Sequence, residues 1–378
     1  MRLLIVSLLL LACPLSTKAR FEIGNSRPAQ DAEIGQRIRE LLESARKNND
    51  LPGMAGAVLT SKGLVGIGAT GVRKRATQVQ VTVDDEWHLG SDTKAMTATV
   101  IAKLIEQGKL KWDTTIGEAL PDKASGWPAD FSHITMIELL SHHAGLPANI
   151  NWHMPAFSGP MIQQRKRVVE EASKLTLLSK PGTEFSYSNL GYVVAAAIAE
   201  NITGRAWEEM VTDIVFKPLG MTSVGFGGTG TPGKVDQPWP HRADGTPAPM
   251  NGPSVDNPPV MGPAGCVHCT LQDWAKFIAD QLSGELGSGA LLKPETYKKL
   301  HEPPFGGDYA LGWIITQRPW GGGTIFTHAG SNTMNYAVVW IAPKRDFAVL
   351  VTSNQGGPAA TKGCDEAAGS LIRLYTKQ

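Results

Sequence analysis

Strand-like patterns lie at both ends of this chain, and helix-like patterns fill its middle. The strand-like runs are short and bounded by turn residues; they are 53–61, 63–72, 310–317, 324–328, 334–342 and 347–354. Two early strands and four late ones can share one antiparallel sheet only if the chain leaves, builds a helical part and returns. This order predicts an α+β fold, in which helices flank an antiparallel sheet and a mostly helical lobe is inserted.

The helical spacing of apolar residues predicts the remaining elements. We expect an N-terminal amphipathic helix around 34–42, a helix that starts at Ser91, and further helices at 134–141, 168–178, 190–201, 206–216, 271–282, 294–300 and 359–375. The predicted organisation is a discontinuous α/β lobe of residues 20–88 and 305–378, with a helical lobe of residues 89–304 between its halves. A ligand-binding cleft is expected where the two lobes meet.

One long segment, residues 227–265, shows neither the helical spacing nor the strand-like alternation of apolar residues. It contains nine prolines, and structureless loops of this length are uncommon in compact domains and are often functional. We therefore interpret it as a stiff surface loop that borders the cleft.

The first 19 residues differ from the rest of the chain. Arg2 precedes an apolar run too short to span a bilayer, and small residues follow at 17–19. This pattern predicts a secretory signal peptide over residues 1–19 and a secreted or periplasmic protein. The stretch 10–13 also resembles a bacterial lipoprotein cleavage box, and in that alternative Cys13 carries a lipid anchor.

Composition excludes several classes of function. The net charge of +1 and the absence of basic runs in the sequence argue against nucleic-acid binding. No later segment of the sequence approaches the ~20 apolar residues of a membrane span. Cys266 and Cys269 resemble half of a zinc site, but no second ligand pair follows, so no metal or cofactor is expected. A disulfide between Cys269 and Cys364 remains open.

The motif Ser91-Asp92-Thr93-Lys94 carries the strongest functional signal. An extended apolar segment ends at Gly90, and helical spacing begins at Ser91. A serine in the first turn of a helix lies near the positive end of the helix dipole, and a lysine three residues later lies on the same face. A hydroxyl beside a basic amine is an activated nucleophile for acyl transfer.

The same spacing occurs a second time, at Ser44 and Lys47. That copy lies inside the charged N-terminal amphipathic helix, with no junction between a strand and a helix. We interpret it as a solvated helix face. The Ser91 motif therefore needs further support before it can be distinguished from a helix cap with an exposed lysine.

Two further segments provide that support. Tyr187 and Asn189 are two residues apart on an extended loop, so both side chains can face one cavity. Tyr187 can shuttle a proton if Lys94 lowers its pKa, and Asn189 can hold a substrate carbonyl. The segment His328-Ala329-Gly330-Ser331 joins two strands, where a strand edge can present a backbone N–H and Gly330 permits close approach.

The tripeptide of that second segment also has an earlier copy, at residues 143–145. This copy follows a helix, and Gly145 resembles a helix C-cap. His142 and His143 are therefore interpreted as structural residues.

In the order of its motifs the chain resembles the serine β-lactamase and penicillin-binding-protein superfamily, in its class C-like branch. The resemblance covers almost the whole chain after the signal peptide. Besides the Ser91–Lys94 and Tyr187–Asn189 motifs, its segments are residues 51–53, 139–146, 181–182, 218–221, 263–265, 309–313 and 328–330. The resemblance implies a β-lactamase/transpeptidase-like fold.

The resemblance also implies roles for the site residues. Ser91 would be the nucleophile that forms an acyl-enzyme, and Lys94 and Tyr187 would share proton transfer, with the base left open. Asn189 would bind a substrate carbonyl or amide oxygen. The backbone N–H groups of Ser91 and Ser331 would form an oxyanion hole.

One departure bears on the substrate. Many β-lactamases have a lysine at the position of His328, and its fixed charge helps to hold a substrate carboxylate. An ordinary histidine is mostly neutral at pH 7. We therefore expect a hydrolase of esters or of D-alanyl-type peptides and amides, with at most weak β-lactam turnover. The alternatives are a true class C-type β-lactamase and a non-turnover penicillin-binding sensor of cell-wall fragments.

Overall fold

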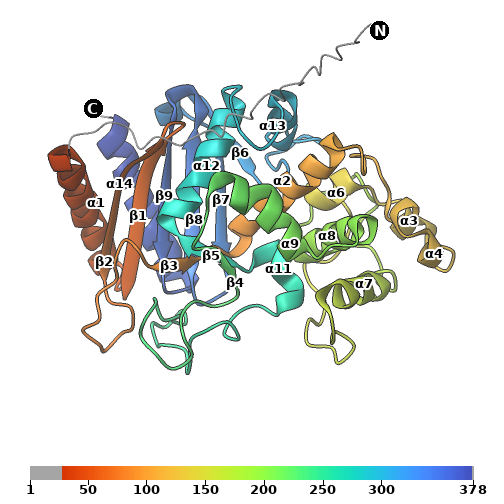
Figure 1. The fold of residues 1–378 in the computed structure, drawn as a ribbon, viewed down its shortest axis with the longest axis horizontal. Helices are drawn as coiled ribbons and strands as arrows, with labels where there is room; N and C mark the ends of the chain where they lie inside the picture. Colours follow the sequence, from red (N-terminus) through yellow and green to blue (C-terminus); the bar gives the residue numbers. More distant parts are fainter. Residues whose placement is uncertain (1–27, 377–378) are drawn as a thin grey trace, which may run out of the picture.

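The computed structural model describes residues 28–376, and one six-stranded antiparallel sheet lies at its centre (Figure 1). The strand order is β2-β1-β9-β8-β7-β6. The strands are β1 Gly53–Thr60, β2 Gly63–Gly71, β6 Ile314–Arg318, β7 Gly323–Ser331, β8 Tyr336–Ala342 and β9 Phe347–Ser353. The two early strands join the four late ones through pairing of β1 with β9, where Gly56 lies opposite Val351. The predicted α+β fold with its shared sheet is confirmed.

Helices cover both faces of this sheet, because the strands bury side chains on alternate sides. In β9, Val349 and Val351 pack with α1 (Pro28–Asn48) and α14 (Gly357–Thr376). Leu350, between them, faces the opposite side and packs with α12 (Leu271–Glu285). The all-buried pattern of β9 follows from this double cover.

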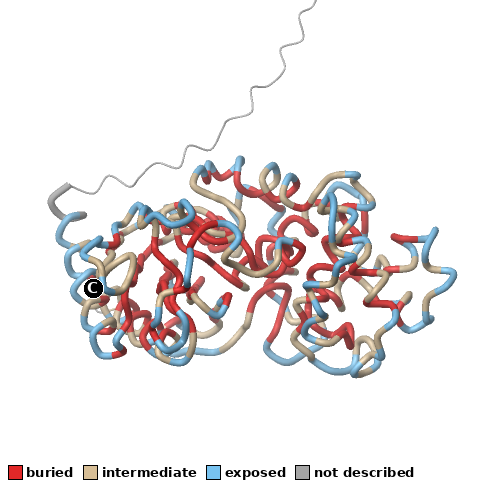
Figure 2. The backbone as a smooth tube through the Cα atoms, turned by 90° about the horizontal axis from the view of Figure 1, so that it is seen from below, coloured by how far each residue is buried: buried red, intermediate tan, exposed pale blue. Residues whose placement is uncertain are grey.

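The remaining helices form the body that extends to the side of the sheet (Figure 1). They are α2 Thr93–Glu106, α3 Ile116–Ala119, α4 Pro121–Ala124, α5 Ala129–Ser132, α6 Met136–Leu140, α7 Met161–Ala172, α8 Asn189–Thr203, α9 Trp207–Val211, α10 Lys217–Leu219, α11 Gly262–Gly265 and α13 Pro294–Leu300. Buried segments gather along the middle of the molecule in Figure 2, and every residue from 190 to 200 in α8 is buried. One continuous apolar core joins these helices to the sheet. Across residues 28–376, no helix is both long and apolar enough to cross a membrane.

A second, three-stranded sheet was not predicted. Its strands are β3 Glu86–His88, β4 Gly225–Phe226 and β5 Val267–Thr270, in the order β3-β5-β4. Strands of two to four residues are too short to show alternation in the sequence. The sheet matters for the site because β3 leads directly to Ser91.

The helix predicted over 168–178 begins and ends about seven residues earlier, as α7. Its first turns contain Arg165, which is fully buried and pairs with Glu200 and Glu208. A charged residue on the inward face conceals the helical pattern there. The chain leaves the helix after Ala172, and the backbone N–H of Leu178 bonds the carbonyl of Gly145 instead. Leu175 and Leu177 therefore pack against the core from an irregular segment, and Leu178 is exposed.

The loop of residues 227–265 is more buried than the sequence suggested. His241 and Asn251 are fully buried, and the ring of His241 bonds the backbone oxygen of Asn354 at the end of β9. The last part of the segment forms a 3-10 turn, Pro259–Met261, followed by α11. Its interpretation as a surface loop was therefore wrong for these parts.

The Cys269–Cys364 bridge that the sequence left open is not formed. Cys266, Cys269 and Cys364 are buried, and none of them is in a disulfide. Cys269 lies in the core on the α12 side of the sheet, whereas Cys364 lies in the core on the α1 and α14 side. The sheet separates the two thiols, and each is buried in a different part of the core.

Candidate active site

Ser91 lies where β3 turns into α2. Gly90 takes a left-handed backbone conformation with φ of 51°, and the 3-10 turn Gly90–Asp92 leads into the helix. Lys94 follows one turn later, and its Nζ lies 3.0 Å from Ser91 Oγ. Ser91 is half-buried and Lys94 fully buried. The predicted junction of strand and helix thus brings the two side chains into hydrogen-bond contact.

Three acceptors surround the Lys94 amine: Ser91 Oγ, Asn189 Oδ1 at 2.7 Å and the carbonyl oxygen of Ala264 at 2.7 Å. An ammonium can donate to all three, and a neutral amine can donate to two while accepting the Ser91 proton. Burial lowers the pKa of Lys94 to about 7. Both protonation states are therefore populated near neutral pH, as a general base requires.

Tyr187 completes the contacts of the nucleophile. Its hydroxyl donates to Ser91 Oγ at 2.8 Å. The condition under which Tyr187 could shuttle a proton, a pKa lowered by Lys94, is not met, because burial raises that pKa. Lys94 Nζ lies 4.9 Å from the centroid of the Tyr187 ring and bonds other partners. Tyr187 thus remains a protonated hydrogen-bond donor at neutral pH.

Asn189 is the first residue of α8 and bridges two parts of the site. Its Oδ1 accepts from Lys94, and its Nδ2 donates to Asn149 Oδ1 at 3.0 Å. The preceding Ser188 caps the helix by accepting from the N–H of Gly191. Asn189 is half-buried, so its amide can reach both solvent and the buried amine.

His142, interpreted as structural, packs beneath Tyr187 with ring centroids 4.3 Å apart. Its Nδ1 accepts from the backbone N–H of Ser188 at 3.0 Å. Burial lowers the pKa of His142 well below its usual value, so the ring is neutral. Its contacts position Tyr187 and do not reach Ser91.

His328 lies in β7 but its side chain is only 3% exposed. Its Nε2 lies 3.0 Å from the hydroxyl of Tyr309, and its Nδ1 lies 3.7 Å from Asp92 Oδ1. Both carboxylate oxygens of Asp92 lack a hydrogen-bond partner among the described residues, and burial raises the pKa of this group. His328 therefore lies below the surface of the site, beside a carboxyl group that the sequence analysis did not single out.

Gly330 and Ser331 bring β7 against the nucleophile turn. A Cβ atom on Gly330 would overlap the backbone of Leu89 and Ser91, and a Cβ atom on Gly90 would overlap the backbone of Ser331. Only glycine at both positions permits this approach. The backbones of Ser91 and Ser331 therefore lie side by side, and Ser331 is exposed.

Sequence reasoning missed three contributors besides Asp92. They are the Ala264 carbonyl, Asn149, and a rim of exposed aromatic rings at Phe185 (51% exposed) and Phe305 (39% exposed) that pack on His143. Of these, Ala264 had a signal because it lies within one of the ordered family motifs, and Phe185 because it is two residues before Tyr187. Asn149 and Phe305 come from loops whose approach to Ser91 no local pattern encodes.

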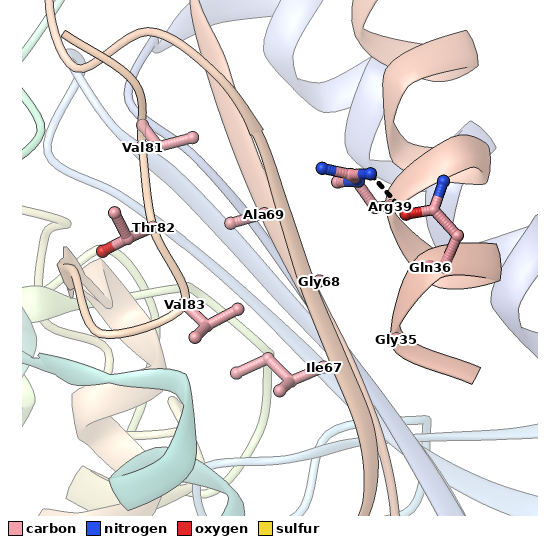
Figure 3. A pocket seen from close by; sticks show the side chains of 9 residues that line it. All are labelled: Gly35, Gln36, Arg39, Ile67, Gly68, Ala69, Val81, Thr82 and Val83. Carbon is pink, nitrogen blue, oxygen red and sulfur yellow. Dashed lines mark hydrogen bonds between the residues drawn. The ribbon is translucent and has the colours of Figure 1, made fainter. Parts of the chain in front are cut away.

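A hollow away from this site is shown in Figure 3. It is lined by residues of α1, β2 and the segment 81–83, and its one charged side chain, Arg39, bonds Gln36. None of the predicted site residues lines it. Within the part of the chain that the structure describes, no cluster of three or more His, Cys, Asp or Glu side chains is arranged to hold a metal ion.

Comparison with known proteins agrees with this site and with the fold. The chain is 31% identical over 183 residues to penicillin-binding protein 4 of Amycolatopsis lactamdurans, an alignment that covers 48% of this chain and 47% of that protein. The chain thus spans about half the length of this curated relative.

Two solved structures share the fold. The D-alanine carboxypeptidase AmpC from Burkholderia cenocepacia matches with a TM-score of 0.70 and 18% identity, over 90% of this chain and 99% of that one. A class C β-lactamase from Rhodobacter sphaeroides matches with a TM-score of 0.69 and 20% identity, over 89% and 99%. The Beta-lactamase family model matches residues 37–371, nearly the whole described chain. With its fold, its Ser91–Lys94 contact and this match, the protein belongs to the β-lactamase family.

Proposed function

We propose that this protein is a serine hydrolase, secreted or periplasmic, that works through an acyl-enzyme at Ser91. The observation that carries the proposal is the placement of Ser91 Oγ between Lys94 Nζ at 3.0 Å and the Tyr187 hydroxyl at 2.8 Å. A basic amine and a hydroxyl donor thus contact the same serine oxygen, and this arrangement is suited to nucleophilic catalysis.

In the acylation step, the neutral amine of Lys94 accepts the Ser91 proton as Oγ attacks the substrate carbonyl carbon. The backbone N–H groups of Ser91 and Ser331 stabilise the resulting oxyanion. The intermediate then expels an alkoxide or amine, which leaves with the proton that Lys94 accepted. Asn189 holds the carbonyl or amide oxygen of the substrate.

In the deacylation step, water attacks the acyl group and the Ser91–acyl bond breaks. Lys94 accepts a proton from this water and returns it to the departing Ser91 Oγ, while Tyr187 stabilises that oxygen through the hydrogen bond that it already donates. The products are a carboxylic acid and the free hydroxyl of Ser91. No metal or cofactor takes part in the proposed cycle.

The proposed substrates are esters or D-alanyl-type peptides and amides, with weak β-lactam turnover. The fold that this chain shares with the D-alanine carboxypeptidase from Burkholderia cenocepacia supports the D-alanyl-type peptides among these substrates. The exposed rings of Phe185 and Phe305, which pack on His143, favour a substrate with an apolar group. The buried position of His328, next to the carboxyl group of Asp92, disfavours it as a strong anchor for a substrate carboxylate.

Two alternatives use the same residues. A class C-type β-lactamase would turn over a cephalosporin efficiently, and the class C β-lactamase of the same fold favours that alternative. A penicillin-binding sensor would give one burst of acylation without steady-state turnover. A panel of nitrophenyl esters, D-amino-acid amides and a chromogenic cephalosporin distinguishes the three.

A fluorophosphonate probe tests the nucleophile directly. We expect it to label the wild-type protein once, with the mass increment on the peptide that contains Ser91. Labelling on any other residue would contradict the acyl-enzyme proposal.

The His328→Lys substitution tests the link to the substrate carboxylate. Lysine would place a full positive charge beside Asp92, just below the surface of the site, and its interaction with a solvated substrate carboxylate is worth about 0.5–1 kcal/mol. We expect cephalosporin turnover to rise ~2–5-fold relative to hydrolysis of a neutral ester. The measurement is the ratio of the two kcat/KM values, with His328→Gln as the uncharged control. An unchanged ratio in His328→Lys would rule out this account of substrate choice.

A further inference from the structure

A buried chain of hydrogen bonds links the two segments that hold the backbone N–H groups of the proposed oxyanion hole. Asp256, at the end of the long loop, accepts from His88 Nε2 at 2.8 Å and from Asn332 Nδ2 at 2.8 Å. His88 is three residues before Ser91, and Asn332 directly follows Ser331. One carboxylate thus contacts both sides of the site without touching Ser91, Lys94 or Tyr187.

On the nucleophile side, His88 holds the turn before Ser91. Its Nδ1 accepts from the backbone N–H of Gly90 at 3.1 Å. Since Nδ1 accepts there, the neutral ring must carry its proton on Nε2, which donates to Asp256. The carboxylate of Asp256 therefore fixes the tautomer that Gly90 needs.

On the β7 side, Asn332 shapes the turn after Ser331. Its Oδ1 accepts from the backbone N–H groups of Met334 and Asn335, at 3.2 Å and 2.9 Å. Because Asn332 Nδ2 donates a hydrogen bond to Asp256, the orientation of the Asn332 side chain amide is fixed. The direction in which the chain leaves Ser331 depends on it.

The bridge is buried and charged. The side chains of His88 and Asp256 are 2% and 1% exposed, and Asn332 is 4% exposed. Burial alone would raise the pKa of Asp256, but its bonds with His88 and Asn332 hold that pKa below the usual value. Hydrogen bonds to an ionised, buried acceptor are short and strong, so the bridge is stiff.

We propose that Asp256 is a positioning residue for acyl transfer at Ser91. Through His88 and Asn332 it fixes the relative placement of the Ser91 and Ser331 backbone N–H groups, and so aligns the oxyanion hole. This inference rests on the proposed acyl-enzyme function. It assigns a role to the proline-rich loop, which delivers Asp256 to a point between β3 and β7.

The Asp256→Asn substitution tests this role, because asparagine keeps the shape but replaces one acceptor with a donor. Either Asn332 loses its acceptor, or His88 must accept at Nε2, move its proton to Nδ1 and oppose the Gly90 N–H. A displacement of about 1 Å in a catalytic group can cost ~10²-fold in rate. We expect kcat for a nitrophenyl ester to fall ~10–100-fold, with KM within about 2-fold.

The matched control is Asp273→Asn. Asp273 is also buried, and it accepts from the backbone N–H groups of Thr222 and Ser223, away from the site. Both variants are compared with the wild type by thermal unfolding, by ester kinetics and by inhibition with phenylboronic acid, which forms a tetrahedral adduct with a serine. We expect Asp273→Asn to lower thermal stability while kcat stays within about 2-fold of the wild type.

The boronic acid separates positioning from a purely structural role. If Asp256 aligns the oxyanion hole, its loss should weaken phenylboronic acid binding by about the same factor as kcat/KM. A folded Asp256→Asn protein with wild-type kcat and boronate affinity would overturn the inference, as would a kcat loss equal to that of Asp273→Asn at equal loss of stability. Failure of the wild type itself to acylate at Ser91 would instead refute the proposed function.

Discussion

Ser91→Ala is expected to abolish ester hydrolysis, whereas Ser44→Ala should leave it unchanged. Loss of the nucleophile in a serine hydrolase removes ~10⁴–10⁶-fold in kcat, because only binding and the oxyanion hole remain. Ser44 has the same spacing to a lysine, but it is exposed on α1 and Lys47 Nζ pairs with Glu43 at 3.1 Å. Steady-state kinetics with a nitrophenyl ester measures both effects.

The two variants separate the effect of the contact between serine and lysine from that of the sequence spacing alone. Ser91 is half-buried and its hydroxyl is not required by the core, so Ser91→Ala should unfold within a few degrees of the wild type. Covalent labelling by the fluorophosphonate should disappear with the activity. Residual hydrolysis above about a thousandth of the wild-type rate, in a preparation free of contaminating esterase, would contradict the assignment of Ser91.

The central sheet was predictable because its constraint is global. Two strand-like runs before the helices and four after them can form one sheet in only a few ways. In the structure, β1 pairs with β9 and so joins the early strands to the late ones. Ser91 and Lys94 were predictable for a local reason, since the start of a helix fixes residues i and i+3 on one face. The spacing permits the contact of Nζ with Oγ but does not fix it, because Ser44 and Lys47 have the same spacing and Lys47 pairs with Glu43 instead.

What could not be predicted depends on approaches between distant segments. Asp92 is in the motif itself, yet its burial beside His328 appears only when β7 packs on the nucleophile turn. Asp256 comes from a segment without any period, and its two partners are 168 and 76 residues away. The pKa values of Lys94 and Tyr187 could not be predicted for a related reason. Desolvation, which depends on the assembled core, is the largest cause of the shift at each group.

Lys94→Met is expected to lower kcat/KM by ~10²–10⁴-fold and to remove the acidic limb of the pH profile. Burial lowers the pKa of Lys94 to about 7, so the wild-type rate should rise with pH through that value as the neutral amine forms. Lys103→Met is the control on the same helix, since Lys103 Nζ bonds the carbonyl of Leu291 far from Ser91. A wild-type profile that is flat between pH 5.5 and 8.5 would exclude Lys94 as the base.

Stability supplies an independent test of the same pKa. A lysine whose pKa is lowered on folding binds fewer protons in the native state, so its unfavourable contribution is complete below pH 7 and shrinks as the pH rises toward the unfolded value near 10.5. Relative to the wild type, Lys94→Met should therefore gain about 2–3 kcal/mol more free energy of unfolding at pH 6 than at pH 9. Urea unfolding of both proteins at the two pH values measures the difference. An equal stability gap at both would mean that Lys94 titrates at its ordinary pKa in the folded protein, and that the base must be sought in Tyr187.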